Sequence, residues 1–273
     1  MDTILLKDLR VNRLGFGAMR VLGSEDIWGP PKDPANARKV LRRAYELGAN
    51  FFDTAESYGP HTGEAVIAEA MHPYPKDLVI GTKCGLARPK PSRWDEDGRP
   101  EKLKSDLEGS LKRLKLDCLH LWQLHAPDPK VPFEDSVGVL AEARHQGKVR
   151  HVGLSNVTAR QLEQARKIVP IVSVQNRYNI GDRHSEDVLK ACEKLGIAFL
   201  PWYPLGDGSA LKNVKVKSLA KKLEASPAQV AIAWLLAKSP VMLPIPGTSS
   251  IEHLEENMGA TSVRLSDEDM AAL

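Results

Sequence analysis

Cysteine is scarce in this chain. Three cysteines occur, Cys84, Cys118 and Cys192, and no two of them form a CxxC pair. An odd number of well-separated cysteines favours reduced thiols over a disulfide framework or a zinc site. The histidines show no HExxH spacing that would indicate another metal. We therefore expect no metal ligands, and we expect the protein to work in the reducing cytoplasm.

Charge imbalance and long hydrophobic runs are also missing. The chain has 38 Lys and Arg against 35 Asp and Glu, a net charge of +3, which is too balanced to indicate a nucleic-acid surface. No apolar run approaches the roughly 20 residues of a membrane-spanning helix. The opening segment, MDTILLKDLRVNRLG, carries charges too early for a secretory signal. We therefore expect a globular protein with no nucleic-acid or membrane partner, and nothing in the sequence indicates its oligomeric state.

What the chain does contain is a regular alternation of short apolar runs with longer amphipathic stretches. The expected strands span residues 14–18, 50–54, 78–83, 118–125, 149–155, 171–175, 198–203 and 241–245. The expected helices span residues 36–48, 102–116, 133–147, 158–169, 185–196 and 226–238.

Eight such units in 273 residues predict a closed (β/α)₈ barrel, with residues 1–273 forming a single domain. An open dinucleotide-binding sheet is disfavoured, because no GxGxxG follows the first strand. The longest irregular segments, 19–35, 84–101, 125–132 and 204–213, each follow an expected strand. Barrels of this kind carry their sites on that face, so we expect the site there.

Four side chains at the ends of successive strands make chemical sense together. Asp53 and Tyr58 follow the second strand, Lys83 ends the third and His125 ends the fourth. A lysine ammonium beside a phenol favours the phenolate and lowers the phenol pKa, and a carboxylate would hold that lysine charged. A histidine can orient a substrate oxygen. The set predicts a proton donor, Tyr58, for a carbonyl oxygen.

The carbonyl carbon must then receive a hydride, which no side chain supplies, so a cofactor is required. Ser155, Asn156 and Gln175 at later strand ends offer hydroxyl and amide groups suited to a carboxamide. Trp202 offers an aromatic face for a nicotinamide ring, with the adjacent Tyr203 as the competitor for that place. The segment GTSSIEHLEEN predicts a helix start that favours phosphate.

At these residues the chain resembles the aldo-keto reductase family. The resemblance rests on FFDTAESYG, TKCG, LWQLHAPD, KVRHVGLSN, VQNRYN, PWYPLG and IPGTSSIEHLEEN, which occur in the family's order over residues 10 to 260. It implies reduction of aldehydes or ketones by NADPH, with Tyr58 as the acid supported by Asp53, Lys83 and His125. The cofactor-binding residues it implies are Ser155, Asn156, Gln175, Trp202, Tyr203, Leu205, Gly247, Thr248, Ser249, Ser250, His253, Glu256 and Asn257.

Two departures from the family's pattern affect the expectations. Gly247 and His253 stand where the family commonly has a lysine and an arginine for the 2′-phosphate of NADP. The hydroxyls of Thr248, Ser249 and Ser250 can replace them, so NADP stays the expected cofactor and NAD the less favoured one. The chain also ends at Leu273, without the long C-terminal substrate loop of some members, which predicts a more open pocket and broader substrates.

Two alternatives stay open at this level. The same fold and residues suit a nucleotide-binding regulatory subunit with little turnover. A lyase or isomerase barrel that binds phosphate but no nicotinamide is the other. Turnover of a simple aldehyde separates the first alternative from a reductase, and a response of the tryptophans to NADPH separates the second.

Overall fold

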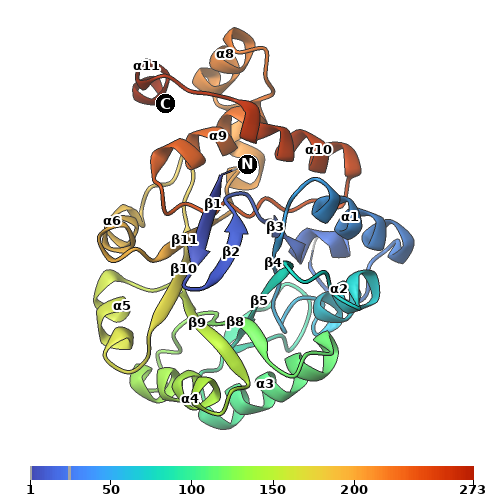
Figure 1. The fold of residues 1–273 in the computed structure, drawn as a ribbon, viewed down its shortest axis with the longest axis vertical. Coiled ribbons are helices and arrows are strands. Elements are labelled where there is room, and N and C mark those ends of the chain that lie inside the picture. The colour runs from blue at the N-terminus through green and yellow to red at the C-terminus, as the bar shows by residue number, and fades with distance from the viewer. Residues whose placement is uncertain (1, 24–25) are drawn as a thin grey trace.

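Seven parallel strands curl into most of a barrel, with helices around the outside (Figure 1). The structure is a computed structural model that describes residues 2–23 and 26–273. The strands, in their order around the sheet, are β11 (Ala198–Trp202), β10 (Ile171–Arg177), β9 (Val149–Ser155), β8 (Leu119–Leu124), β5 (Val79–Cys84), β4 (Phe51–Asp53) and β3 (Phe16–Gly17).

The eighth expected strand, 241–245, closes the ring without forming a regular strand. Its backbone exchanges hydrogen bonds of 2.8 and 2.9 Å with Phe199 of β11. Toward β3, the carbonyls of Pro244 and Pro246 accept bonds of 3.0 and 3.2 Å from the backbone N–H groups of Gly15 and Gly17. Prolines have no N–H to donate, so the ladder is incomplete on this side. The (β/α)₈ barrel expected from the sequence is confirmed.

The helices that cover the strands include all six of the expected ones. They are α1 (Pro34–Glu46), α2 (Thr62–Met71), α3 (Pro100–Leu114), α4 (Phe133–His145), α5 (Ala159–Arg166), α6 (Glu186–Leu195), α9 (Pro227–Lys238) and α10 (Ile251–Gly259). Of these, α2 had not been expected, because both its first turn and most of its later positions are buried and it therefore lacks an amphipathic period. Cap residues set several starts, as at α9, where Ser226 and Gln229 form a capping box.

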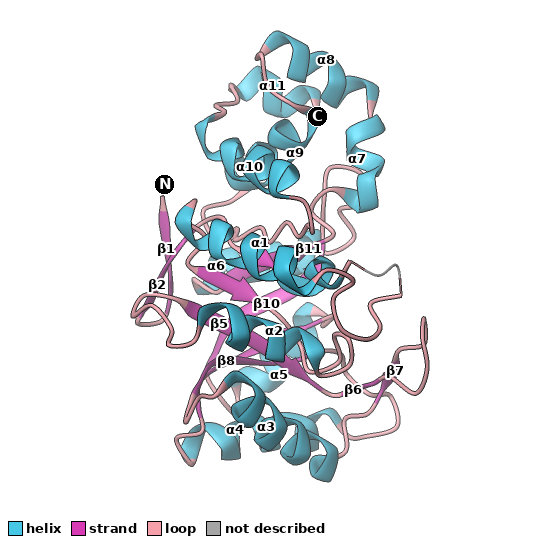
Figure 2. Cartoon of the chain, turned by 90° about the vertical axis from the view of Figure 1, so that its right-hand side faces the viewer, coloured by secondary structure: helices cyan, strands magenta, loops and turns pink. Residues whose placement is uncertain are grey.

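Further elements lie at the ends of the barrel. The hairpin of β1 (Thr3–Leu6) and β2 (Leu9–Asn12) crosses one end, and the short ribbon of β6 (Leu86–Ala87) and β7 (Asp95–Glu96) lies at the other (Figure 2). The remaining elements are η1 (Ala18–Leu22), η2 (Gly206–Gly208), α7 (Ser209–Lys212), α8 (Val214–Lys222), η3 (Ala260–Ser262) and α11 (Asp267–Ala272). The expected irregular segments 19–35, 84–101 and 204–213 therefore contain short ordered elements. Residues 24 and 25 of the first lie outside the described residues.

Alternation along the strands separates two cores. Side chains such as Phe52 and Trp122 face the helices. Phe51, Val79 and Leu121 face the barrel interior, where they pack against the β1–β2 hairpin. Further along the strands, the same inward faces become polar. The polar inward residues are Asp53, Lys83, Gln123, Ser155 and Gln175.

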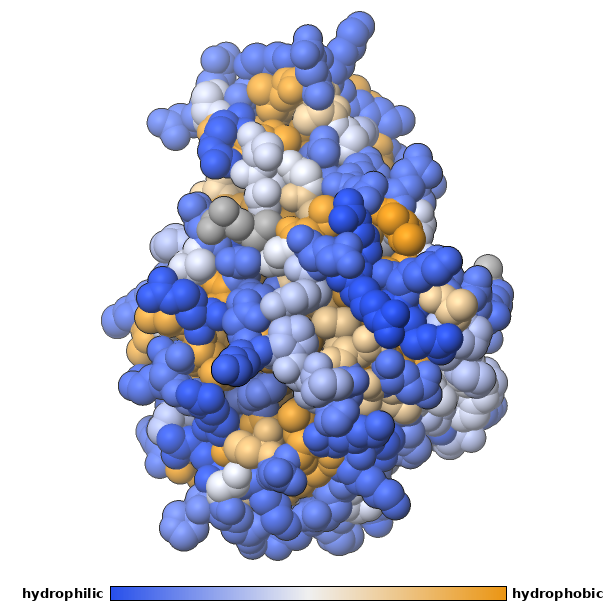
Figure 3. Space-filling view, turned by 45° about the vertical axis from the view of Figure 1, so that its right-hand side comes forward, coloured by the Kyte–Doolittle hydropathy of each residue, from blue (hydrophilic) through white to orange (hydrophobic). Residues whose placement is uncertain are grey.

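The outer surface is largely hydrophilic. In the view of Figure 3, hydrophobic residues form small patches separated by hydrophilic ones. None of the helices in the described ranges is long and apolar enough to cross a membrane.

Candidate active site

A buried ion pair forms the floor of the site. Lys83 Nζ donates to Asp53 Oδ2 at 2.6 Å and to the backbone carbonyl of Thr54 at 2.8 Å. The Lys83 side chain is fully buried and that of Asp53 is 4 % exposed. Gln175 Nε2 donates to the other carboxylate oxygen of Asp53 at 2.8 Å. Burial lowers the pKa of Lys83, but Asp53 and Tyr58 outweigh it, so the pKa is raised and the ammonium stays charged.

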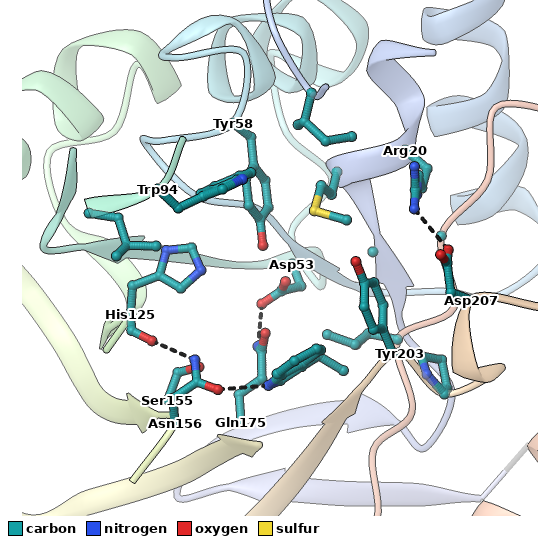
Figure 4. A pocket seen from close by; sticks show the side chains of 18 of the residues that line it. Arg20, Asp53, Tyr58, Trp94, His125, Ser155, Asn156, Gln175, Tyr203 and Asp207 are labelled. Carbon is teal, nitrogen blue, oxygen red and sulfur yellow. Dashed lines mark hydrogen bonds and ion pairs between the residues drawn. The ribbon is translucent and has the colours of Figure 1, made fainter. Parts of the chain in front are cut away.

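Tyr58 lies directly against this ion pair. Lys83 Nζ is 3.3 Å from the phenol oxygen, and the phenol also lies close to Asp53 (Figure 4). The loop Thr54–Tyr58 turns back over the barrel end, with the N–H of Glu56 donating to the carbonyl of Lys83 at 3.3 Å. The pairing of β4 with β5 therefore brings the Asp53 carboxylate and the Lys83 ammonium together, although they are 30 residues apart in the sequence. The phenol of Tyr58 joins them from the loop after β4.

The expected lowering of the Tyr58 pKa is wrong for the free protein. Burial raises the pKa of Tyr58 above its usual value, and the Lys83 ammonium offsets only part of that effect. A phenolate in this enclosed position loses its hydration, and the nearby Asp53 carboxylate disfavours it further. Tyr58 therefore holds its proton at neutral pH, as a proton donor requires.

His125 stands beside the phenol at the end of β8. Its ring centroid is 5.8 Å from that of Tyr58, and its Nδ1 is 3.4 Å from Ser57 Oγ. Burial, and to a smaller degree the Lys83 ammonium, hold the pKa of His125 well below its usual value. The imidazole is therefore neutral at pH 7 and can offer one N–H to a substrate oxygen.

Asn156, which directly follows β9, links several groups at this edge of the barrel. Asn156 Nδ2 donates to the carbonyl of His125 at 2.9 Å and to Ser155 Oγ at 3.1 Å. The indole N–H of Trp202 donates to Asn156 Oδ1 at 3.0 Å. Together with the bond from Gln175 to Asp53, these contacts fix the polar groups along one wall (Figure 4).

A cavity of about 720 Å³ opens above these residues. Its lining includes many of the expected site residues. Those that line it are Asp53, Tyr58, His125, Ser155, Asn156, Gln175, Trp202, Tyr203, Leu205 and Gly247. Lys83 contacts the phenol of Tyr58, and Tyr58 lines the cavity. Tyr203 has a φ of 51°, an uncommon conformation for a bulky residue that is often found at functional sites.

The other expected cofactor residues lie beyond this lining, where the chain enters α10. Thr248 Oγ1 accepts a 3.0 Å bond from the N–H of Ser250. Ser250 Oγ caps α10 by accepting from the N–H of His253 at 3.3 Å. The carbonyl of Ser249 accepts from Asn36 of α1 at 2.7 Å. Glu256 is half-buried and Asn257 is buried on the same helix. These residues therefore lie along α10 and the segment that leads into it.

Two further features of the site lie on loops. Trp94, which precedes β7, lines the cavity with its ring 6.1 Å from that of Tyr58, and the guanidinium of Arg88 lies 3.6 Å from its centre. Across the mouth, Arg20 of η1 and Asp207 of η2 form an ion pair of 3.0 Å (Figure 4). Both features depend on loop conformations, and no motif in the sequence marks them.

Comparison with known proteins gives the class. A model of the aldo/keto reductase family matches residues 13–273. The chain is 43% identical to the pyridoxine 4-dehydrogenase of Escherichia coli, over all of this chain and 97% of that protein. It is 47% identical to an uncharacterized oxidoreductase of Schizosaccharomyces pombe, over 99% of this chain and 88% of that protein.

Solved structures agree with this. A thermostable aldo-keto reductase, Tm1743, solved with the inhibitor epalrestat, superimposes with a TM-score of 0.86 at 31% identity, covering 99% of this chain and 98% of that one. The glycerol dehydrogenase of Gluconobacter oxydans gives 0.90 at 25% identity, over 99% and 93% of the two chains. Both the matched family and these relatives are named as reductases, dehydrogenases or oxidoreductases. The chain belongs to the aldo/keto reductase family.

Proposed function

We propose that this protein reduces aldehyde or ketone carbonyls to alcohols, using a hydride from NADPH and a proton from Tyr58. The observation that carries the proposal is the 3.3 Å contact between the phenol of Tyr58 and the Lys83 ammonium, on the floor of a 720 Å³ cavity. We further propose that residues 1–273 act as one domain and that the protein works in the cytoplasm.

The residues around the cavity suit a nicotinamide cofactor. Hydroxyl and amide groups of Ser155, Asn156 and Gln175 lie together on one wall, next to the indole of Trp202, and match a carboxamide on an aromatic ring. The backbones of Gly17 and Gly247, which both line the cavity, pass very close to each other. A Cβ on Gly247 would lie only 2.3 Å from the carbonyl oxygen of Gly17, so a side chain does not fit there. When bound there, the cofactor supplies the hydride that the side chains cannot.

The chain's own residues manage the proton. His125 and Tyr58 hold the carbonyl oxygen, and the Tyr58 hydroxyl gives it a proton as the carbon is reduced. The phenolate left behind lies beside the Lys83 ammonium, which stabilises it. Asp53 keeps Lys83 charged and in place through the 2.6 Å bond. Tyr58 then recovers a proton from solvent before the next turnover.

The preference for NADP is part of the proposal. Thr248 and Ser250 each use an oxygen as an acceptor of backbone N–H bonds, which leaves their hydroxyl hydrogens to donate to a phosphate. With Gly247 and His253 in place of the family's common lysine and arginine, the discrimination against NAD is expected to be modest, resting on hydroxyl donors, Ser249 included. Glu256 and Asn257 on the next turn of α10 are proposed to meet the adenine.

The cavity wall suggests the kind of carbonyl compound. Tyr58, Trp94 and His125 present aromatic edges and faces on one side, with ring centroids 5.8 to 6.5 Å apart. Flat aromatic rings pack well against such a wall. The Escherichia coli relative is named for the dehydrogenation of pyridoxine, an alcohol on an aromatic ring. We therefore propose pyridoxal and other small aromatic aldehydes as substrates.

Consumption of the reduced nucleotide tests the proposal. Purified protein is mixed with NADPH or NADH and with pyridoxal, benzaldehyde or a simple ketone, and nucleotide absorbance is followed. Steady consumption with an aromatic aldehyde, faster with NADPH, is expected. Tight NADPH binding without turnover of any carbonyl would instead support a regulatory subunit. If NADPH does not change tryptophan fluorescence at all, the result would instead support a lyase or isomerase that binds no nicotinamide.

A further inference from the structure

Arg88 is a charged residue in an unusual position. It directly follows β6 in the loop that joins β5 to α3, yet it is only 8 % exposed. Arginine is seldom buried unless its donors are used. The contacts of its guanidinium therefore indicate what it does.

Those donors all reach backbone carbonyls. Nη2 donates to Asp26 at 2.7 Å, and Nη1 donates to Ile27 at 3.2 Å and to Ser57 at 3.3 Å. Nε donates to Arg93 at 3.0 Å. The acceptors come from three separate segments, one after β3, one after β4 and one in the loop of Arg88 itself. A planar fork of five N–H donors can satisfy several carbonyls at once, which a lysine cannot.

The segments that Arg88 joins are those that enclose Tyr58. Ser57 immediately precedes Tyr58. The segment 26–29 is also bound to the Tyr58 loop, since the N–H of Gly29 donates to Gly59 at 2.8 Å and the N–H of Gly59 donates to Ile27 at 3.2 Å. Ile27 and Tyr58 belong to one small apolar cluster with Trp94 packed against it.

Arg88 also supports the wall that a substrate would contact. Its Cζ lies 3.6 Å from the ring centre of Trp94, close enough for a cation–π contact, and 5.5 Å from that of Trp28. Trp94 lines the cavity, and its ring meets those of Tyr58 and His125 edge to face. The guanidinium thus holds both the ring of Trp94 and the backbone before Tyr58.

We propose that Arg88 is a positioning residue that sets the substrate wall, Ile27 and Trp94, against Tyr58. This inference rests on the proposed reductase function. Arg88 holds three loops by their backbones, so its loss displaces the aldehyde rather than the nucleotide, whose proposed contacts lie on β9, β10, β11 and α10. Small displacements of this kind cost about 10- to 100-fold in efficiency.

Two variants of Arg88 and one matched control test the proposal. Arg88→Met removes the fork and Arg88→Lys keeps only the charge. Arg93→Met is the control, because Arg93 lies in the same loop with its side chain 56 % exposed and pairs with Asp95. We expect KM for the aromatic aldehyde to rise about 10- to 100-fold in Arg88→Met and less in Arg88→Lys, with kcat reduced by a smaller factor. NADPH affinity and the control should stay near wild type.

A second readout does not need activity. Amide hydrogen exchange should speed up in segments 26–29 and 57–63 of both Arg88 variants and stay unchanged in the control. If the Arg88 variants exchange faster but the wild-type protein reduces no aldehyde, the proposed function is wrong and the structural role of Arg88 stands. Wild-type KM and exchange in both Arg88 variants would overturn the inference. So would a proportional loss of aldehyde and NADPH binding, which indicates general damage.

Discussion

The two ends of the barrel interior are built from the same strands and do opposite work. At the end covered by the β1–β2 hairpin, inward side chains such as Phe51, Val79 and Leu121 form an apolar core with Leu6. At the other end, further along the same strands, the inward side chains are Asp53 and similar residues that are charged or carry amide groups and are almost fully buried. From Phe51 to Asp53 this change takes only two residues, about 7 Å of strand.

This contrast shows how the barrel tolerates a charged floor. The apolar end and the outer core supply the hydrophobic stabilisation, so the polar end need not be optimal for stability. Lys83 and Asp53 are held by each other and by amide groups, and a buried pair of this kind contributes little to stability while each partner depends on the other. The predictions below separate these two roles.

The largest effect is expected at the polar end. Tyr58→Phe removes the proposed proton donor and keeps the ring, so kcat for aldehyde reduction should fall about 10²- to 10⁴-fold. NADPH affinity and unfolding temperature should change little. Steady-state and single-turnover kinetics with fluorescence titration of NADPH measure this, and an active Tyr58→Phe protein would remove the phenol from its role.

Breaking the ion pair is expected to cost both activity and stability. Lys83→Met leaves the Asp53 carboxylate buried without its cation, which should lower the free energy of unfolding by about 3–5 kcal/mol. The double variant Asp53→Asn/Lys83→Met should recover much of that stability and none of the activity. Denaturant unfolding at pH 7 checks it; equal stability of the two variants would show that the pair is not tightly coupled.

At the apolar end, a change should affect stability alone. Leu6→Ala opens a cavity beneath the barrel and should cost about 2–5 kcal/mol of unfolding free energy. The neighbouring Leu5 is 53 % exposed and provides a matched control, for which Leu5→Ala should cost less than about 0.5 kcal/mol. Activity per folded molecule should match wild type in both. A fall in kcat with Leu6→Ala would mean that the two ends are not separate.

The smallest effect concerns Glu56, a buried residue of the loop between Asp53 and Tyr58. Burial, and next the Asp106 carboxylate, raise the pKa of Glu56 from 4.5 to about 7, although Lys102 at 3.3 Å opposes this. A carboxyl group with a raised pKa binds its proton more tightly when folded, so its contribution to stability falls as pH rises from 4.5 to 7.

Glu56→Gln removes that titration. The unfolding temperature of wild type minus that of Glu56→Gln should therefore decrease between pH 5 and pH 8, as thermal scans at several pH values can show. A difference that stays flat or increases over this range would contradict the raised pKa.

The strand-end residues could be predicted from the sequence because strand periodicity and barrel closure fix where they lie. Asp53 ends β4 and Lys83 is the last inward-facing residue of β5, so their meeting followed from topology. Arg88, Trp94 and the Arg20–Asp207 pair could not be found in this way. They lie on loops, whose paths depend on many weak contacts that no local pattern records. The sign of the Tyr58 pKa shift also depended on burial, which the sequence does not show.

The barrel itself shows the same limit. Seven expected strands are confirmed, but the segment 241–245 pairs irregularly because of its prolines. The β1–β2 hairpin was not expected, although its residues alternate, since the turn at Lys7, with a φ of 63°, has no glycine to mark it. Helix α2 was missed because it is buried on several sides.

A double-variant cycle tests the central claim most directly, namely that the Lys83 ammonium acts through the hydroxyl of Tyr58. Single-turnover rates of aldehyde reduction are measured for wild type, Tyr58→Phe, Lys83→Met and the double variant, at saturating NADPH. If Lys83 acts through Tyr58, the double variant should be no slower than Tyr58→Phe within about threefold. Losses that multiply in the double variant would show that the two residues act independently, and would contradict the account.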